Sequence, residues 1–358
     1  MIPRKSADYI AFCHTKGILS RNKLPLHYKK ILLIKDPFLP FDALHENLLA
    51  WYERHGRHEL PWRKTDDVYR VYLSEVMLQQ TQVKRVLEEY YFQFLERFPT
   101  LAAMACSPLE EVYGMWSGLG YYRRAQNLHA SAKLCKEGLP QDIDALRKLP
   151  GVGRYTAHAI MSFGFKECVS VVDTNIARVL RRYFALENPN DKELWERADL
   201  LLNRQNPTHH NLALMDLGAT VCLASNPTCH ACPLEATCQG KHDAHRYTKK
   251  EKKNYEAKNL YFGVCIKENK IAMQKANGGM YKDLLTLPSL DEPQENGYFG
   301  SFNHAVTRFR LSVHLYTLHA IDAEGIIWVD RASLPNAPIS SMTKKALACY
   351  EKHAKEAL

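Results

Sequence analysis

The chain has 358 residues, which is enough for two domains of ordinary size. Hydrophobic residues make up 46% of it, as in typical globular proteins, and no apolar run reaches the length of a membrane span. The formal net charge of +9 favours a polyanionic partner without identifying one. Ten cysteines are many for an intracellular chain but few for a disulfide scaffold of this length.

Residues 1–38 carry scattered basic side chains but no helical period and no apolar core of a secretory signal. We expect them to form a basic extension, although their scarcity of acids would also suit an organelle transit peptide. A helical pattern starts at Phe41 and is broken by Leu60-Pro61-Trp62-Arg63. Trp62 and Arg63 offer flat faces for stacking on a base, but the same residues are also consistent with an ordinary loop.

Asp66 and Asp67 are both candidates to cap a helix whose apolar stripe starts at Val68 and continues past Val83. Glu75 lies in an apolar stretch of this helix, where burial would raise the pKa of its carboxyl and keep it protonated. The alternative is a solvated glutamate, as most helical glutamates are. Gln79, Gln80 and Gln82 follow, either as surface amides or as side chains that reach base edges.

Two glycine-containing segments predict tight turns. Trp116–Arg124 combines glycines with tyrosines and two arginines, which suggests aromatic wedges and phosphate contacts, or simply a glycine-closed turn with packed rings. Leu149–Gly153 cannot continue a helix, and the helix expected to begin near Arg154 would present free N–H groups to a phosphate. Asp173 follows β-branched residues and precedes a helical pattern, so we expect an N-cap whose ionised form the helix dipole favours.

Four cysteines cluster with gaps of six, two and five residues: Cys222, Cys229, Cys232 and Cys238. This clustering indicates a metal site rather than disulfides, and the run is compact enough for four thiolates to hold an iron–sulfur cubane. Zinc sites usually pair two short Cys–Cys spacings or add histidines, so zinc is the less favoured alternative.

The remaining chain predicts a change of architecture. Residues 241–258 are rich in lysine without an apolar period and read as a basic linker. From Leu260 onward, hairpin signals and the alternation in Phe309–Leu315 predict strands, and residues 341–357 predict a closing helix. We therefore expect a helical domain over 39–240 and a small α+β domain over 259–358.

The glycine hairpin, Asp173 eighteen residues after Tyr155, and the cysteine spacing together resemble the helix–hairpin–helix/Gly-Pro-Asp superfamily of DNA glycosylases. The cysteine spacing is that of its endonuclease III branch. Tyr155 stands where bifunctional members carry a lysine, and Ser74–Gln82 is similar to the MutY family of adenine DNA glycosylases. This resemblance implies a mostly α, two-lobed glycosylase domain with one 4Fe–4S cluster, followed by a small α+β Nudix-like recognition domain. That domain lacks a Nudix box, so we expect no pyrophosphohydrolase activity.

The resemblance also implies a monofunctional enzyme of base excision repair. It would hydrolyse the N-glycosidic bond of adenine paired with 8-oxoguanine or guanine in double-stranded DNA. Glu75 would protonate the leaving adenine, and Asp173 would stabilise the sugar cation. Asn175 would orient Asp173 or the water, and Tyr155 would support the sugar cation or the carboxylates.

Binding residues follow from the same resemblance. Those expected in the adenine pocket are Leu60, Trp62, Arg63 and Asp216. Those expected to reach bases or wedge into the gap are Gln79, Gln80 and Tyr121. Those expected on the DNA backbone are Gly151, Val152 and Gly153. Those expected to ligate the 4Fe–4S cluster are Cys222, Cys229, Cys232 and Cys238.

One segment departs from the family pattern. Val306-Thr307-Arg308 stand where MutY relatives usually carry Phe-Ser-His in a loop that senses 8-oxoguanine. Thr307 keeps the hydroxyl, whereas the aromatic wedge and the imidazole are lost. We therefore expect weaker discrimination between 8-oxoguanine and guanine partners.

Two other functions remain open on the sequence. One is an endonuclease III-like glycosylase for oxidised pyrimidines, but Tyr155 and Glu75 are evidence against it. The other is an iron–sulfur DNA-binding protein without catalysis, in which Glu75 and Asp173 are a surface residue and a cap. We further expect a monomer without membrane attachment, cytoplasmic and nucleoid-associated in a bacterium, or in an organelle or the nucleus of a eukaryote.

Overall fold

The computed structural model describes most of the chain: residues 41–248, 254–276, 278, 281, 284–306, 308–321 and 324–356. The expectations for residues 1–38 and for Thr307 lie outside this part, as does the middle of the expected linker. The chain divides into two compact units, Met1–Asn47 and Leu48–Leu358. No helix in the described part is both long and apolar enough to cross a membrane.

Helix α3 (Phe41–His55) begins where the sequence predicts a helical pattern. Within the second unit its face of Leu48, Trp51 and Tyr52 is buried, as residues three and four apart on one helix face should be. Arg54 and His55 occupy its last turn, where the helix dipole favours positive charge. The helix ends just before Arg57, a residue of the site described below.

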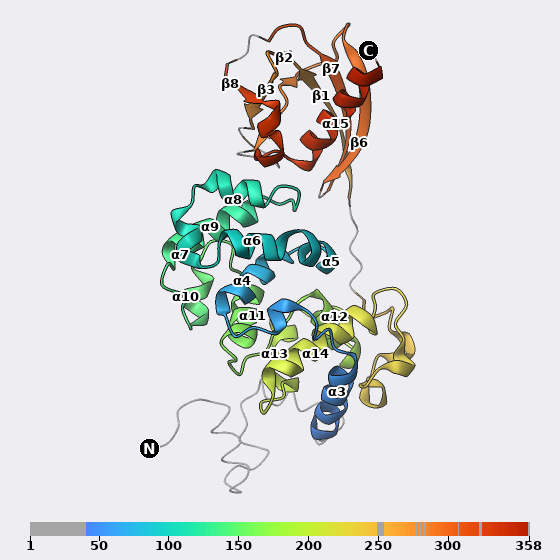
Figure 1. Ribbon diagram of the computed structural model, residues 1–358. Coiled ribbons are helices and arrows are strands. Elements are labelled where there is room, and N and C mark those ends of the chain that lie inside the picture. The colour runs from blue at the N-terminus through green and yellow to red at the C-terminus, as the bar shows by residue number, and fades with distance from the viewer. Residues whose placement is uncertain are drawn as a thin grey trace, which may run out of the picture. The chain divides into compact units, whose positions relative to one another are not determined.

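The middle of the chain is helical, as Figure 1 shows in blue-green to yellow. Its elements are η2 (Pro61–Arg63), α4 (Val68–Met77), α5 (Val83–Arg85), the π-turn η3 (Val86–Tyr90), α6 (Tyr91–Arg97), α7 (Leu101–Cys106), α8 (Leu109–Met115), α9 (Arg123–Leu134), α10 (Ile143–Arg147), α11 (Arg154–Ala159), the π-turn η4 (Ile160–Gly164), α12 (Thr174–Tyr183), α13 (Asp191–Leu201), α14 (Pro207–Thr220), η5 (Cys229–Ala231), η6 (Glu235–Thr237) and η7 (Lys241–Asp243).

Helix α4 lies at the centre of this helical part. Eight of its ten residues, Tyr69 and Val71–Met77, are buried, and it packs against α6, α9, α11 and η4. The Asp67 carboxylate caps it by accepting from the N–H groups of Tyr69 and Arg70, which confirms the predicted start. A side chain in its last turn is therefore surrounded by protein on nearly every side.

The predicted continuation of this helix past Val83 is wrong. Helix α4 ends at Met77, the chain turns through Leu78–Gln82, and Gln80 adopts a left-handed φ of +58°. The carbonyls of Val76, Met77 and Gln79 accept from the distant Arg124 guanidinium instead of from the N–H groups of a further helical turn. Apolar spacing does not reveal such a long-range donor, which is why the break was missed.

The glycine hairpin has the predicted form. Gly151 has a φ of +75°, and a Cβ there would lie 2.5 Å from the Asn127 side-chain nitrogen, so both backbone and space require glycine. Helix α11 starts at Arg154 with Gly153 as its N-cap. Asp173 is the N-cap of α12, which confirms the second predicted helix start.

The C-terminal part contains two four-stranded sheets and a helix. The strands are β1 (Glu256–Val264), β2 (Ile266–Lys267), β3 (Lys270–Lys275), β4 (Leu285–Thr286), β5 (Ser289–Leu290), β6 (Tyr298–Val306), β7 (Phe309–Thr317) and β8 (Ile326–Asp330). The remaining elements are η9 (Arg331–Asn336) and α15 (Ser341–Glu356). One sheet has the order β5-β1-β7-β6, and the other has β2-β3-β4 with β8 beside β3.

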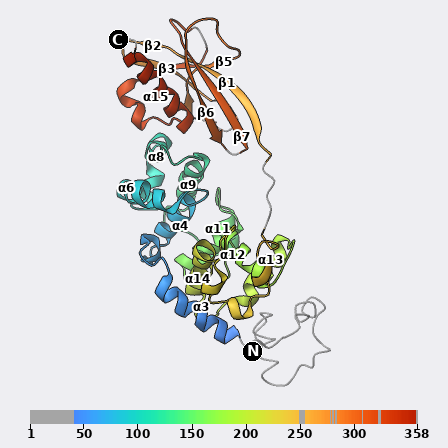
Figure 2. The same ribbon diagram turned by 90° about the vertical axis from the view of Figure 1, so that its right-hand side faces the viewer.

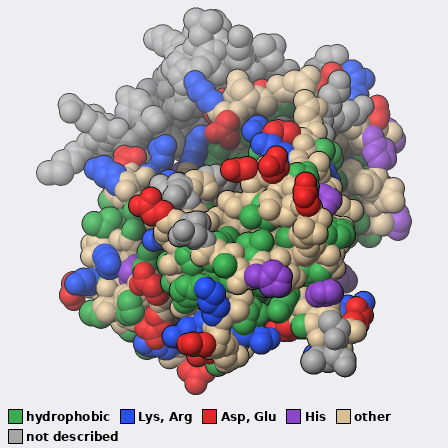
Figure 3. All heavy atoms as spheres, turned by 90° about the horizontal axis from the view of Figure 1, so that it is seen from above, with side chains coloured by type: hydrophobic (Ala, Val, Ile, Leu, Met, Phe, Trp, Pro, Cys, Tyr) green, Lys and Arg blue, Asp and Glu red, His purple; other side chains and the backbone are tan. Residues whose placement is uncertain are grey.

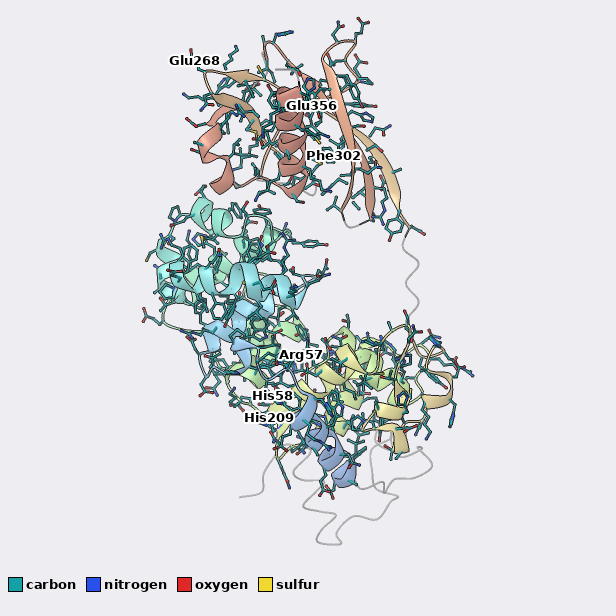
Figure 4. All side chains as sticks on the ribbon, turned by 45° about the vertical axis from the view of Figure 1, so that its right-hand side comes forward. Arg57, His58, His209, Glu268, Phe302 and Glu356 are labelled. Carbon is teal, nitrogen blue, oxygen red and sulfur yellow. The ribbon has the colours of Figure 1, made fainter. Side chains whose placement is uncertain are left out.

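These strands confirm the α+β prediction. The long strands β1, β6 and β7 run side by side, with β1 and β7 parallel and β6 and β7 antiparallel (Figure 2). Leu311, Val313 and Leu315 alternate into the core as predicted. Glu268 and Asn269 both have positive φ in the tight β2–β3 turn, where Figure 4 labels Glu268. On the face drawn in Figure 3, Lys and Arg are interspersed with Asp and Glu.

Candidate active site

A cavity of about 420 Å³ opens beside the end of α4. This volume lies within the range of small-molecule pockets. Seven of the sequence-predicted site residues line it: Leu60, Trp62, Arg63, Glu75, Tyr155, Asp173 and Asn175. They come from η2, α4, α11 and the start of α12, and the fold thus brings together segments that are more than a hundred residues apart.

Glu75 lies in the last turn of α4 and is only 7% exposed. The Tyr155 hydroxyl donates to its Oε2 atom over 2.6 Å. Burial raises the pKa of Glu75 to about 7, the nearby Asp173 adds to this, and the hydrogen bond from Tyr155 and the charge of Arg63 oppose it. The predicted upward shift is confirmed, and near neutral pH the carboxyl is protonated in about half of the molecules.

Asp173 has hydrogen bonds to both carboxylate oxygens. The Ile176 N–H donates to Oδ1 over 2.7 Å, and the Asn175 amide donates to Oδ2 over 3.0 Å. Burial nevertheless raises the pKa of Asp173, with these hydrogen bonds and Arg178 acting in the opposite direction. The cap does supply the expected hydrogen bonds to the ionised carboxylate. Desolvation nevertheless has a larger effect on the pKa than these hydrogen bonds, so the expected downward shift is wrong.

Burial also affects Tyr155. It raises the pKa of the phenol well above its ordinary value, and the charges of Glu75 and Asp173 add to the shift. The hydroxyl is therefore a neutral hydrogen-bond donor at physiological pH. A phenol has no amine with which to form a Schiff base.

Asp216 does not line the cavity, contrary to the prediction. Its side chain is fully buried, and it accepts from Arg63 Nη1 over 2.6 Å and Nη2 over 2.8 Å. Arg57 donates to it through Nε over 2.7 Å and through its backbone N–H over 2.9 Å. Burial alone would raise the pKa of Asp216, but the two arginines outweigh it and lower the pKa. Asp216 thus positions the Arg63 side chain, which does line the cavity.

The residues expected to wedge into DNA lie outside the cavity lining. Gln80 and Tyr121 occupy two loops, and Tyr121 is 44% exposed. The Gln79 amide turns toward α11, with the Thr156 hydroxyl 3.5 Å away. In the hairpin, Gly151 and Gly153 are exposed, whereas Val152 is buried in the core.

Several lining residues escaped the sequence analysis. Arg57 and His209 approach the cavity from the end of α3 and from α14, and Figure 4 labels both. Lys166 has a φ of +60° and donates to the Phe163 carbonyl over 2.8 Å. None of these residues stands in a recognisable motif, so only the fold shows that they share one cavity. Gly218 of α14 was also missed, and a Cβ there would lie 2.9 Å from the Asn175 carbonyl oxygen.

The four clustered cysteines line one small cavity of about 30 Å³ together with Arg182. Arg182 is 2% exposed, and its Nη1 atom lies 3.2 Å from the Cys222 sulfur. The lining also includes Glu235, and a set of four thiols suits a soft metal centre. Within the described ranges, no group of three His, Cys, Asp or Glu residues has the arrangement expected to hold a single metal ion.

Comparison with known proteins defines the class. A family model described as "HhH-GPD superfamily base excision DNA repair protein" matches residues 73–203, which contain Glu75, Tyr155 and Asp173. A thermostable thymine-DNA glycosylase is structurally similar, with a TM-score of 0.53 and 29% sequence identity over 56% of this chain and 96% of that one. The helical part is therefore that of a DNA glycosylase of the helix–hairpin–helix superfamily.

Sequence relatives define the family. An adenine DNA glycosylase of Buchnera aphidicola subsp. Baizongia pistaciae is 39% identical over 258 residues, 69% of this chain and 73% of that relative. The Homo sapiens adenine DNA glycosylase is 42% identical over 217 residues, 56% of this chain and 39% of the human protein. The chain belongs to the adenine DNA glycosylase family.

The same comparison bears on the endonuclease III alternative. An endonuclease III in a non-covalent complex with DNA has a TM-score of 0.50 at 22% identity, covering 58% of this chain and 100% of that one. At this identity the similarity shows the shared fold alone. The resemblance inferred from the sequence is thus confirmed for the superfamily and for the adenine glycosylase family.

Replacing Asp216 with asparagine is expected to destabilise the protein by about 3 kcal/mol, because two arginines would lose their shared buried counter-charge. Urea denaturation followed by circular dichroism measures the effect. The control is Asp191→Asn, which removes an exposed carboxylate that pairs with Arg154 over 3.3 Å at the surface. That change should cost less than about 1 kcal/mol, and equal effects would contradict the positioning role of Asp216.

Proposed function

We propose that this chain is a monofunctional glycosylase that hydrolyses the N-glycosidic bond of adenine opposite 8-oxoguanine or guanine in double-stranded DNA. The observation that carries the proposal is the pair of carboxyls, Glu75 and Asp173, that line one cavity in different environments. Tyr155, which has no amine, stands beside them.

The chemistry follows the logic of glycoside hydrolysis. Glu75, with a pKa of about 7, is available as an acid that protonates the adenine leaving group. Asp173 in its ionised form stabilises the oxocarbenium-like sugar. Asn175 holds one oxygen of that carboxylate over 3.0 Å and limits its orientation. Strand cleavage through a Schiff base has no nucleophile at Tyr155, so the product is an abasic site.

Adenine must leave the base stack before it can enter the cavity. We propose that Leu60, Trp62 and Arg63 line its binding site, with Trp62 buried against Tyr91 at a ring distance of 5.1 Å. Gln80 and Tyr121 fill the gap that adenine leaves and touch the opposite base. Gly151, Val152 and Gly153 bind the DNA backbone.

We propose one 4Fe–4S cluster per chain, held by Cys222, Cys229, Cys232 and Cys238. Their common cavity and the cysteine spacing support this assignment. When bound, the cluster supplies a rigid core for the loop that surrounds it. The purified protein should then be brown, whereas a zinc protein would be colourless.

The C-terminal part is proposed to be a Nudix-like domain that recognises the base opposite adenine. The sequence predicts a helical domain at 39–240, a linker at 241–258 and this domain at 259–358. Because η7 (Lys241–Asp243) and Ala244 pack with the helical part and β1 begins at Glu256, we place the linker between Thr248 and Glu256. Its β6–β7 hairpin carries Val306 and Arg308, and the Arg308 guanidinium lies over the Phe309 ring at 5.0 Å. We expect the protein to act as a monomer.

Single-turnover cleavage of four duplexes tests the proposal, with adenine opposite 8-oxoguanine, guanine, cytosine or thymine. We expect base release only opposite 8-oxoguanine and guanine, with strand breaks appearing mainly after alkali. Glu75→Gln and Asp173→Asn should each slow release by about a hundredfold or more while mismatched DNA is still bound. Breaks without alkali would support an endonuclease III-like lyase, and no release from a brown, DNA-binding protein would refute the catalytic assignment.

The pH dependence of base release should be bell-shaped. Activity requires protonated Glu75, so the rate should fall about tenfold per unit as pH rises above its pKa of about 7. Activity also requires ionised Asp173. Because burial raises the pKa of Asp173, the acidic limb should lie at a higher pH than the ionisation of an ordinary aspartate would place it. Rates at subsaturating enzyme from about pH 5 to about pH 9 report these free-enzyme groups. Loss of the alkaline limb in Glu75→Gln is the control, and an unchanged limb would assign it to another group.

Replacing Val306-Thr307-Arg308 with Phe-Ser-His should increase the preference for 8-oxoguanine over guanine by about tenfold, because an aromatic wedge and an imidazole are restored. The ratio of single-turnover rates on the two duplexes measures the change. The conservative variant Arg308→Lys is the control and should leave the ratio close to that of the unaltered chain. An unchanged ratio in the full replacement would contradict the proposed role of this segment.

A further inference from the structure

Two loops carry the proposed wedge residues, and both bend through unusual backbone conformations. We call residues 78–82 and 117–121 the wedge loops. Gln80 has a φ of +58° and Tyr121 a φ of +50°, and side-chain-bearing residues adopt this left-handed region at a cost of about 1 kcal/mol or more. Such conformations persist only when the surrounding structure fixes them.

One buried arginine contacts both loops. Arg124 lies in the first turn of α9 and is 7% exposed. Its Nη1 atom donates to the carbonyl oxygens of Val76 over 3.0 Å, Met77 over 2.7 Å and Gln79 over 2.7 Å. Its Nη2 atom donates to the Thr81 hydroxyl over 3.2 Å and to the carbonyl oxygens of Leu119 over 3.3 Å and Gly120 over 3.0 Å.

Three of the six acceptors belong to the immediate chain neighbours of Gln80 and Tyr121, and the carbonyls of Val76 and Met77 belong to the end of α4. Gln79 and Thr81 are the two chain neighbours of Gln80, and the guanidinium binds the backbone carbonyl of the first and the side-chain hydroxyl of the second. Gly120 immediately precedes Tyr121, and the guanidinium also lies 5.4 Å from the centre of the Tyr121 ring. The two loops are distant in sequence, and Arg124 joins them directly.

The charge of Arg124 is compensated by these carbonyls. Among the described residues, none of the ion pairs found includes Arg124. Burial lowers the pKa of Arg124 to about 10, which still leaves it positive at neutral pH. Its Nε atom is buried without a hydrogen-bond partner in the described structure. A planar fork of donors can reach several carbonyls at once, whereas the ammonium group of lysine cannot reproduce this geometry.

We propose that Arg124 is a positioning residue that joins the two wedge loops into one rigid unit, so that Gln80 and Tyr121 enter the duplex together and drive adenine out of the stack. This role rests on the proposed function of Gln80 and Tyr121. Arg124 itself does not line the catalytic cavity, but Leu78, Thr81 and Gln82 of the loop that it holds do. A comparison of paired with unpaired adenine therefore separates an effect on extrusion of the base from an effect on cleavage of the glycosidic bond.

The variant Arg124→Lys keeps the charge and removes the fork. It should slow single-turnover adenine release opposite 8-oxoguanine by about tenfold to a hundredfold, since small misplacements of positioning groups have effects of this size. Adenine opposite an abasic site has no pairing partner to break, and its release should change by less than about twofold. Equal losses on both substrates would indicate a general structural role and overturn the proposal.

A double-variant comparison tests whether Arg124 acts through the wedge residues. Adding Arg124→Lys to a Gln80→Ala, Tyr121→Ala variant should cause little further loss, because effects on one unit are not additive. Fully additive losses would contradict the proposal. Thr81→Val removes one acceptor of Arg124 while keeping the side-chain shape. Thr81 also lines the cavity, so this variant tests the proposal only through the difference between the two substrates. It should slow release opposite 8-oxoguanine more than release opposite an abasic site, by a smaller factor than Arg124→Lys does. It replaces Arg124→Lys if that variant fails to fold.

Arg97→Lys is the matched control. Arg97 pairs with Glu111 at the surface and lies 5.1 Å from the centre of the Phe98 ring, so it shares the aromatic contact of Arg124 without touching either wedge loop. It should leave all rates unchanged.

Base extrusion is read separately, by the fluorescence increase of 2-aminopurine placed at the adenine position. If the unaltered chain extrudes the base normally but does not release adenine, the proposed function is refuted and the role of Arg124 in extrusion is not. Undiminished fluorescence with Arg124→Lys would refute the positioning role of Arg124.

Discussion

The hydrogen bond between Tyr155 and Glu75 is the interaction on which the site depends. It joins α11 to the last turn of α4, and both groups are buried where water cannot solvate a charge. Burial favours the protonated carboxyl, and the phenol offers the charged form a partner. A pKa of about 7 results from this balance, so Glu75 can hold a proton at neutral pH and still give it up. Helix α4 makes this possible because its neighbours cover nearly all of it.

Asp173 reaches the same cavity from a different structural context. It caps α12, where a backbone N–H and the Asn175 amide bind its two oxygens, whereas Glu75 has a single phenol partner. Burial raises the pKa of both carboxyls, and hydrogen bonds to the charged form oppose this shift at each of them. Two carboxyls with different sets of donors thus share one cavity, which is the arrangement that the proposed division into an acid and an anion requires.

Local signals account for what the sequence predicts well. The cap at Asp67, the helix starts at Arg154 and Thr174 and the alternation of Leu311, Val313 and Leu315 depend on neighbours within a few residues. Glu75 was predicted by its apolar surroundings and by resemblance. The break after Met77 and the burial of Asp216 away from the cavity were not, because Arg124 and Arg63 cause them from positions about fifty and one hundred and fifty residues away.

Buried arginines bind backbone carbonyls in two irregular parts of the chain. Arg124 binds carbonyls at the end of α4 and in the wedge loops. Arg182 donates to the carbonyls of Leu223 over 2.7 Å, Ala224 over 3.1 Å and Ala244 over 2.9 Å around the cysteines. In both places the backbone is irregular, so its carbonyls lack the partners that a helix or sheet would supply. A guanidinium satisfies several of them at once. The proposed DNA wedge and the cysteine loop, both outside regular structure, therefore depend on side chains whose role no sequence period reveals.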